Sequence, residues 1–111
     1  MAIRILIYDD NAALRMSMDA LLSDEADMDV VATIPNPENV ISDLKMFKPD
    51  VVLMDIDMPA VSGVQAVKII RNTYKDLPVI MVRQGVEKGS FEVAFASYFP
   101  NASPVCGFAI L

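Results

Sequence analysis

The chain has 111 residues and a mass of 12.2 kDa, which is the size of one domain with a substantial apolar core. Fifteen acidic and nine basic residues give a net charge of −6, which argues against binding of nucleic acid or an anionic membrane, because both need a basic surface. Histidine is absent, which excludes Ser-His-Asp and Cys-His catalysis, and the single cysteine with no signal peptide favours a cytoplasmic location.

The N-terminal segment predicts a strand followed by a helix. Ile3–Tyr8 is a short run rich in β-branched and aliphatic residues, which indicates a buried strand. A helix is expected over Ala12–Ser23, with Asn11 as its N-cap. The residues expected on its apolar face recur with helical spacing: Leu14, Met18, Leu21 and Leu22.

The same alternation continues through the middle of the chain. Strands are expected at residues 30–33, 51–54 and 79–82, and helices after Pro37 and from Gly63. The middle strand reads as an unbroken apolar run, which is typical of a strand covered on both faces. The resulting β-α-β-α-β-α-β order predicts an open parallel sheet with helices on both sides. The apolar residues expected to face the sheet from the two helices are Val40, Ile41, Leu44 and Phe47, and Val64, Val67, Ile69 and Ile70.

The composition changes after Val82. Residues 89–111 contain one charged side chain, Glu92, and most of the aromatic residues of the chain. Phe91 and Phe95 have a spacing that fits a helix over about residues 87–98, but the alternation through this segment fits a strand equally well. Periodicity alone does not decide between these two interpretations. Residues 105–111 are expected to form a fifth strand.

Three carboxylates stand at the ends of predicted strands. Asp9 and Asp10 follow the first strand, and Asp55 ends the third. If these strands are neighbours, the carboxylates meet at one edge of the sheet, where they repel one another unless a cation lies among them. Oxygen ligands suit Mg²⁺, beside which Asp55 can act as a nucleophile towards phosphorus. The simpler alternative for Asp9 and Asp10 is a solvated turn with a helix cap.

The segments IRILIYDDN, KPDVVLMDIDMP and LPVIM, with Gly63 between the last two, resemble a bacterial response-regulator receiver domain. The resemblance covers residues 2–82 and is nearest to receivers of LuxR/NarL-type transcriptional regulators. It implies one receiver domain over residues 1–111, with an atypical tail at residues 83–111. It also implies a flavodoxin-like α/β fold whose five parallel strands have the order 2-1-3-4-5, here with the last helix missing.

The same resemblance implies a phosphoacceptor site. Asp55 would be the phosphoacceptor, and Asp10 and Asp55 would bind Mg²⁺ directly. Asp9 would act through water, and the backbone carbonyl of Asp57 would complete the protein ligands. A histidine kinase or phosphotransfer protein would supply the phosphoryl group, and the chain would not be an enzyme. Pro59 and Gly63 would shape the adjacent loop.

The tail departs from the family pattern. Arg83 stands where receivers carry Thr or Ser, and Leu111 or Val105 stands where they carry Lys. Loss of these two contacts, each worth about 1–3 kcal/mol, predicts weaker phosphorylation at a retained Mg²⁺ site. Arg83 either replaces the lysine, neutralises the carboxylates or points into solvent. Phe108 is the candidate for the aromatic switch position.

Two interpretations of the tail stay open. A diverged receiver would use it as a surface for a partner or for homodimer formation, because a missing last helix exposes apolar sheet. A reading-frame slip or artificial junction near residue 82 would also leave a receiver pattern followed by this composition. The functional alternative is therefore a receiver-fold interaction module that does not switch by phosphorylation. A phosphatase with an Asp nucleophile is disfavoured, because the chain lacks a cap domain.

Overall fold

The structure, a computed structural model, describes residues 2–56, 58–84, 91–97 and 105–110. Among these residues every helix is too short or too polar to cross a lipid bilayer. The helices are α1 (Ala12–Ser23), α2 (Val40–Phe47) and α3 (Gly63–Thr73). The strands are β1 (Ile3–Tyr8), β2 (Met28–Ile34), β3 (Val51–Asp55), β4 (Val79–Gln84), β5 (Phe91–Ser97) and β6 (Val105–Ile110).

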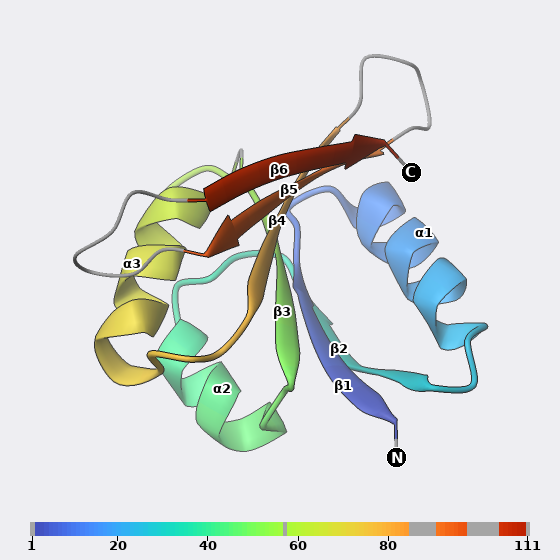
Figure 1. Ribbon diagram of the computed structural model, residues 1–111, viewed down its shortest axis with the longest axis horizontal. Helices are drawn as coiled ribbons and strands as arrows, with labels where there is room; N and C mark the ends of the chain where they lie inside the picture. The colour runs from blue at the N-terminus through green and yellow to red at the C-terminus, as the bar shows by residue number, and fades with distance from the viewer. Residues whose placement is uncertain (1, 57, 85–90, 98–104, 111) are drawn as a thin grey trace.

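The described strands form one sheet with the order β2-β1-β3-β4-β5-β6 (Figure 1). The first four are parallel, and α1, α2 and α3 cross between them, as the alternation of apolar runs and helical segments predicts. The order of these four parallel strands, 2-1-3-4, is the one expected for a flavodoxin-like fold.

The strand predicted at residues 105–111 is observed as β6, but its predicted place as a parallel fifth strand beside β4 is wrong, because β5 lies between them and β4–β5 and β5–β6 both pair antiparallel. The reason is the length of the connection. Only residues 85–90 join β4 to β5, whereas a crossover to a parallel neighbour needs about a dozen residues or more. Of the two open interpretations for residues 87–98, the structure shows the strand, over Phe91–Ser97, and α3 is the last helix within the described residues.

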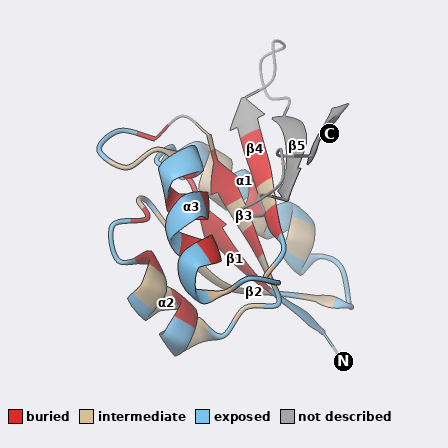
Figure 2. Cartoon of the chain, turned by 60° about the vertical axis from the view of Figure 1, so that its left-hand side comes forward, coloured by how far each residue is buried: buried red, intermediate tan, exposed pale blue. Residues whose placement is uncertain are grey.

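The helices cover the two faces of the sheet unequally. In Figure 1, α2 and α3 lie on one side and α1 lies on the other. The larger core cluster lies beneath α2 and α3, and its fully buried members come from the central strands and from Ala66 and Ile70. The smaller cluster lies beneath α1 and includes Met18. Figure 2 shows the buried residues concentrated along β1, β3 and β4 and on the inner faces of the helices.

Several expectations about burial are corrected. Leu21, Val64 and Ile69 were expected to face the sheet but are 60%, 51% and 40% exposed. In α3 the inward stripe is formed by Ala66, Val67, Ile70 and Arg71, which leaves the flanking apolar residues at the surface. Arg71, although charged and on a helix, is only 3% exposed.

Candidate functional site

Strand register brings Asp9 and Asp55 to the same edge of the sheet. β1 and β3 are parallel neighbours, and Tyr8, the last residue of β1, pairs with Met54. Asp9 follows Tyr8 directly, and Asp55 is the last residue of β3, where it pairs with Val82 of β4. The carboxyl ends of parallel strands are where α/β sheets bind ligands.

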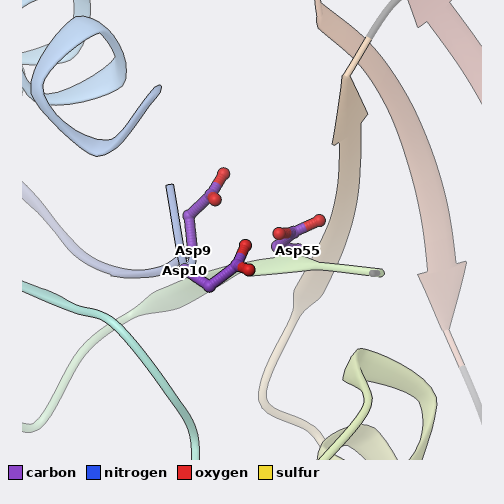
Figure 3. Close-up of side chains that lie close together, drawn as sticks. All are labelled: Asp9, Asp10 and Asp55. Atoms are coloured by element: carbon purple, nitrogen blue, oxygen red, sulfur yellow. The ribbon is translucent and has the colours of Figure 1, made fainter. Parts of the chain in front are cut away.

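The three predicted carboxylates form one cluster. Asp9, Asp10 and Asp55 each offer an oxygen atom, and these atoms all lie within 4.8 Å of one another. Figure 3 shows the three side chains gathered between the ends of β1 and β3. Asp9 is 2% exposed and Asp55 is 7% exposed, whereas Asp10 lies at the surface. Two buried acids beside an exposed one give a cluster that a hydrated cation can reach from one side.

Local hydrogen bonds fix the turn that carries Asp9 and Asp10. The backbone N–H of Asn11 donates to Asp9 Oδ1 at 2.9 Å, and the Asn11 side chain accepts from the first turn of α1, which confirms the predicted N-cap. Arg15 Nη1 donates to the backbone carbonyl of Asp9 at 2.6 Å. The sequence pattern did not single out Arg15, although its place one turn after the cap puts it on the side of α1 that faces the turn.

The electrostatics of the cluster favour occupation by a cation. Burial raises the pKa of the Asp9 carboxyl, and the charge of Asp10 acts in the same direction. The hydrogen bond from Asn11, the contact with Asp55 and the charge of Arg15 oppose this rise. A divalent cation would stabilise the charged carboxylates, and an all-oxygen ligand set is the one that Mg²⁺ prefers.

The loop after β3 holds α3 close to the cluster. Gly63 N donates to the Ile56 carbonyl at 3.2 Å, and a Cβ atom at Gly63 would lie 2.2 Å from the backbone oxygen of Asp55. Ser62 and Gln65 form a capping box that starts α3 at this point. Pro59 lies in the same loop. This close approach is the physical reason for glycine at position 63.

Tyr8, at the end of β1, makes a hydrogen bond to α2. Its side chain is fully buried, and its hydroxyl donates to Asp43 Oδ2 of α2 at 2.8 Å. Burial, followed by the hydrogen bond to Asp43, raises the pKa of Tyr8 far above its ordinary value. This hydrogen bond links Tyr8, which precedes Asp9, to α2.

The remaining predicted site residues are distributed along the tail and the loop. Arg83 lies within β4, one residue beyond the partner of Asp55, and pairs in register with Glu92. Phe108 lies in β6, opposite Ala94 and two strands away from β4. Asp57 and Leu111 lie outside the described residues.

Comparison with known proteins identifies the kind of domain. Residues 5–96 match the sequence model of a family described as "Response regulator receiver domain". A protein-glutamate methylesterase/protein-glutamine glutaminase from Bacillus subtilis is 37% identical over 87 residues, which are 78% of this chain and 24% of that protein. A protein of the same name from Methanosarcina acetivorans is 38% identical over 89 residues, 80% of this chain and 25% of its own length.

The similarity extends to solved structures. The response regulator domain of Thermotoga maritima CheB matches with a TM-score of 0.70 and 35% identity, covering 80% of this chain and 66% of that one. The receiver domain of RcsB from Salmonella enterica matches with a TM-score of 0.69 at 19% identity, over 78% of this chain and 65% of that one, which shows the fold alone.

Two expectations are corrected by these relatives. The chain was expected to be most similar to receivers of LuxR/NarL-type regulators, but the relatives named above are methylesterase/glutaminase proteins. The expectation that the chain would not be an enzyme is overturned by these relatives, which are named as enzymes and of which this chain matches the receiver segment. The chain spans about a quarter of the length of these relatives.

Proposed function

Because the chain belongs to the response regulator receiver domain family, we propose that Asp55 accepts a phosphoryl group in a Mg²⁺-dependent reaction. The donor would be a histidine kinase or a phosphotransfer protein, which supplies the histidine that this chain lacks. The observation that supports the proposal is the cluster of three carboxylates, within 4.8 Å of one another, at the ends of β1 and β3. Receiver domains bind Mg²⁺ at such a cluster.

Each acid has a proposed role. Asp10 and Asp55 would hold Mg²⁺ directly, Asp9 would act through a water molecule, and the Asp57 carbonyl would complete the ligands. When bound, Mg²⁺ supplies positive charge against the oxygens of the incoming phosphoryl group. The hydrogen bonds from Asn11 and Arg15 to Asp9 hold the β1–α1 turn in place before any ligand arrives.

The transfer itself uses one carboxylate oxygen of Asp55. This oxygen attacks the phosphorus of the donor phosphohistidine, a new O–P bond forms, and the P–N bond breaks. The bonding electron pair goes to the imidazole nitrogen, which then takes a proton. The low exposure of Asp55 keeps most solvent from the nucleophile, and the contact of its backbone carbonyl with Gly63 fixes the strand end that carries it.

Arg83 is the proposed cationic partner of the phosphoryl group in place of the family's lysine. Register supports this, because Arg83 follows the residue that pairs with Asp55. Its guanidinium offers several donors to phosphoryl oxygens. Phe108 is proposed as the aromatic switch residue on sequence grounds alone.

A second candidate function has its own supporting observation. The antiparallel pairing of β5 with β4 replaces the parallel fifth strand, which in the family carries the lysine. A receiver-fold module that binds Mg²⁺ without switching by phosphorylation fits this arrangement. Self-association through the tail rests on the sequence alone.

The proposed output is control of an enzyme rather than of transcription. The support is that this chain corresponds to about a quarter of proteins named protein-glutamate methylesterase/protein-glutamine glutaminase. Calorimetric titration of the chain, with and without phosphorylation, into the part of the Bacillus subtilis relative outside the matched 87 residues tests this output. Binding that differs between the two forms supports the proposal, and no binding in either form refutes it. The proposal includes a cytoplasmic location.

The phosphoacceptor proposal is tested with purified chain, Mg²⁺ and acetyl phosphate, read as intact mass. We expect one added phosphoryl group, lost in Asp55→Asn, in Asp10→Asn and on chelation of Mg²⁺. Asp24→Asn is the matched control, because Asp24 is an exposed acid outside the cluster. A folded chain that gains no mass, or gains it equally in Asp55→Asn, refutes the proposal and leaves the module that does not switch.

A further inference from the structure

A groove lies between α2 and α3, at the opposite end of β3 from the carboxylate cluster. Its volume is about 400 Å³, within the range of sites that bind ligands. It is bounded by the end of α2 and the segment that enters β3 on one side, and by the end of α3 and the segment that leads to β4 on the other. The lining residues are Leu44, Lys45, Lys48, Pro49, Tyr74 and Leu77.

The groove combines an apolar surface with unpaired positive charge. Leu44 is 2% exposed and forms the buried part of the lining, while Tyr74 and Leu77 are half-buried. Lys45 and Lys48 are exposed, and neither ammonium group has a hydrogen-bond or ion-pair partner among the residues that the structure describes. In a chain with a net charge of −6, these two lysines place positive charge at the edge of the groove.

Two arginines form hydrogen bonds to the backbone segments on either side of the groove. Arg4 donates from Nη2 to the Phe47 carbonyl at 2.6 Å and from Nε to the Lys48 carbonyl at 3.3 Å. Arg71 donates from Nη1 to the carbonyls of Tyr74 and Leu77. Both walls therefore have backbone acceptors that are already satisfied, and the groove is formed before a ligand binds.

Lys48 occupies a position that favours glycine. It ends α2 with φ 48°, in the left-handed region, where glycine is the usual residue. Its N–H donates to the Leu44 carbonyl, and Arg4 holds its own carbonyl, so the conformation is fixed from both sides. The Lys48 side chain therefore leaves a fixed backbone at the edge of the groove, which the exposed Lys45 also lines.

We propose that this groove binds an acidic peptide segment of a partner protein that presents one apolar side chain. The apolar side chain would pack against Leu44, Tyr74 and Leu77, and carboxylates on either side of it would pair with the two lysines. An extended segment fits better than a small molecule, because the groove is open to solvent along its exposed lysines. Small-ligand sites, in contrast, usually enclose most of the ligand surface.

The test uses the full chain and a fluorescein-labelled peptide of sequence Asp-Glu-Gly-Phe-Gly-Glu-Asp, with fluorescence anisotropy as the readout. We expect Lys45→Glu/Lys48→Glu to weaken binding by about tenfold or more, since two attractive pairs become repulsive. Lys68→Glu/Lys75→Glu is the matched control, because it changes the net charge equally at exposed lysines that do not line the groove. A peptide with alanine in place of phenylalanine should also bind at least about tenfold more weakly.

Four results would overturn the proposal. They are absence of binding by a folded chain, equal loss in the two double variants, unchanged binding in Lys45→Glu/Lys48→Glu, and an alanine peptide that binds as well as the original. Sedimentation distinguishes a second copy of the chain as the occupant. If the chain associates with itself as its concentration rises, and Lys45→Glu/Lys48→Glu abolishes this association, the occupant of the groove is a second copy of the chain and not a peptide of another protein. Peptide binding by Asp55→Asn should be unchanged, so this test stands apart from the phosphorylation assay.

Discussion

Gly63→Ala tests the close approach between α3 and the strand end that carries Asp55. A Cβ atom at position 63 would lie 2.2 Å from the backbone oxygen of Asp55, 3.0 Å from its carbonyl carbon and 2.8 Å from Cε of Met81. The methionine end can swing away, because it is flexible. The Asp55 carbonyl belongs to a central strand and moves only if β3 or the start of α3 moves.

The expected cost comes from this contact. Overpacking of a well-packed site costs about 1–3 kcal/mol, and a clash with backbone lies at the upper end of that range. Replacing glycine by alanine in a helix interior stabilises the helix by up to about 1 kcal/mol. The stabilisation is smaller at position 63, because Gly63 is the first residue of α3. The net destabilisation is therefore about 2 kcal/mol, which lowers Tm by roughly 8 °C in a domain of this size.

The assay is urea unfolding measured by circular dichroism, with phosphorylation by acetyl phosphate as a second readout. Val64→Ala is the matched control, because Val64 is the next residue of α3 and is 51% exposed. Its free energy of unfolding should change by less than about 1 kcal/mol. Equal unfolding midpoints for Gly63→Ala and Val64→Ala would refute the close approach. A normal phosphorylation rate in Gly63→Ala would show that this contact does not fix Asp55.

Three further predictions concern the cluster and its surroundings. Burial raises the pKa of the Asp9 carboxyl above its ordinary 3.8, so the folded state binds this proton more tightly than the unfolded state does. The free energy of unfolding therefore falls as pH rises from about 4 and Asp9 loses its proton. Asp9→Asn should reduce this fall and raise Tm at pH 7. Ala60 has φ 66°, so Ala60→Gly should raise the free energy of unfolding by up to about 1 kcal/mol in urea titrations, and a decrease would contradict strain there. Tyr8→Phe removes the bond to Asp43 and should cost about 1 kcal/mol, whereas Tyr74→Phe, whose hydroxyl has no hydrogen bond among the described residues, should cost less than half of that.

The sequence predicted the part of the fold in which local pattern and topology agree. The unbroken apolar run before Asp55 indicated a strand covered on both faces, and right-handed crossovers then left few arrangements for the first four strands. Because parallel strands end at the same edge, the meeting of Asp9, Asp10 and Asp55 could be predicted from strand positions alone. The structure confirms this meeting as geometry.

The tail was harder because two different effects compete there. Phe91 and Phe95 fit both a helical and an alternating pattern, so side-chain periodicity does not distinguish a helix from a strand here. The structure shows that residues 91–97 form a strand, and only then does the length of the link matter, since residues 85–90 are too few for a helical crossover. A link this short favours the antiparallel pairing of β5 with β4.

Arg71 shows why charge alone is a poor guide to exposure. A charged residue on a helix normally faces solvent, yet the end of α3 leaves carbonyls that need donors. The Arg71 guanidinium donates to two carbonyls just beyond the helix, and its pKa is lowered by the burial that this contact requires. Sequence patterns record which side chains are apolar, but they do not record which backbone acceptors lack partners.

The residues proposed for metal binding and those proposed for switching lie in different parts of the chain. Asn11, Arg15 and Gly63, which contact the ends of β1 and β3, precede β4 in the chain, whereas Asp55 also pairs with Val82 of β4 itself. The departures from the family begin at Arg83, and the tail contacts the rest of the sheet as an antiparallel neighbour of β4. If the proposed phosphorylation occurs, changes in the tail would affect the response to it more than they affect the three carboxylates. The proposed Mg²⁺ binding and the proposed phosphoryl transfer therefore need separate measurements, because Mg²⁺ binding is expected both of a switching receiver and of a module that only binds the metal.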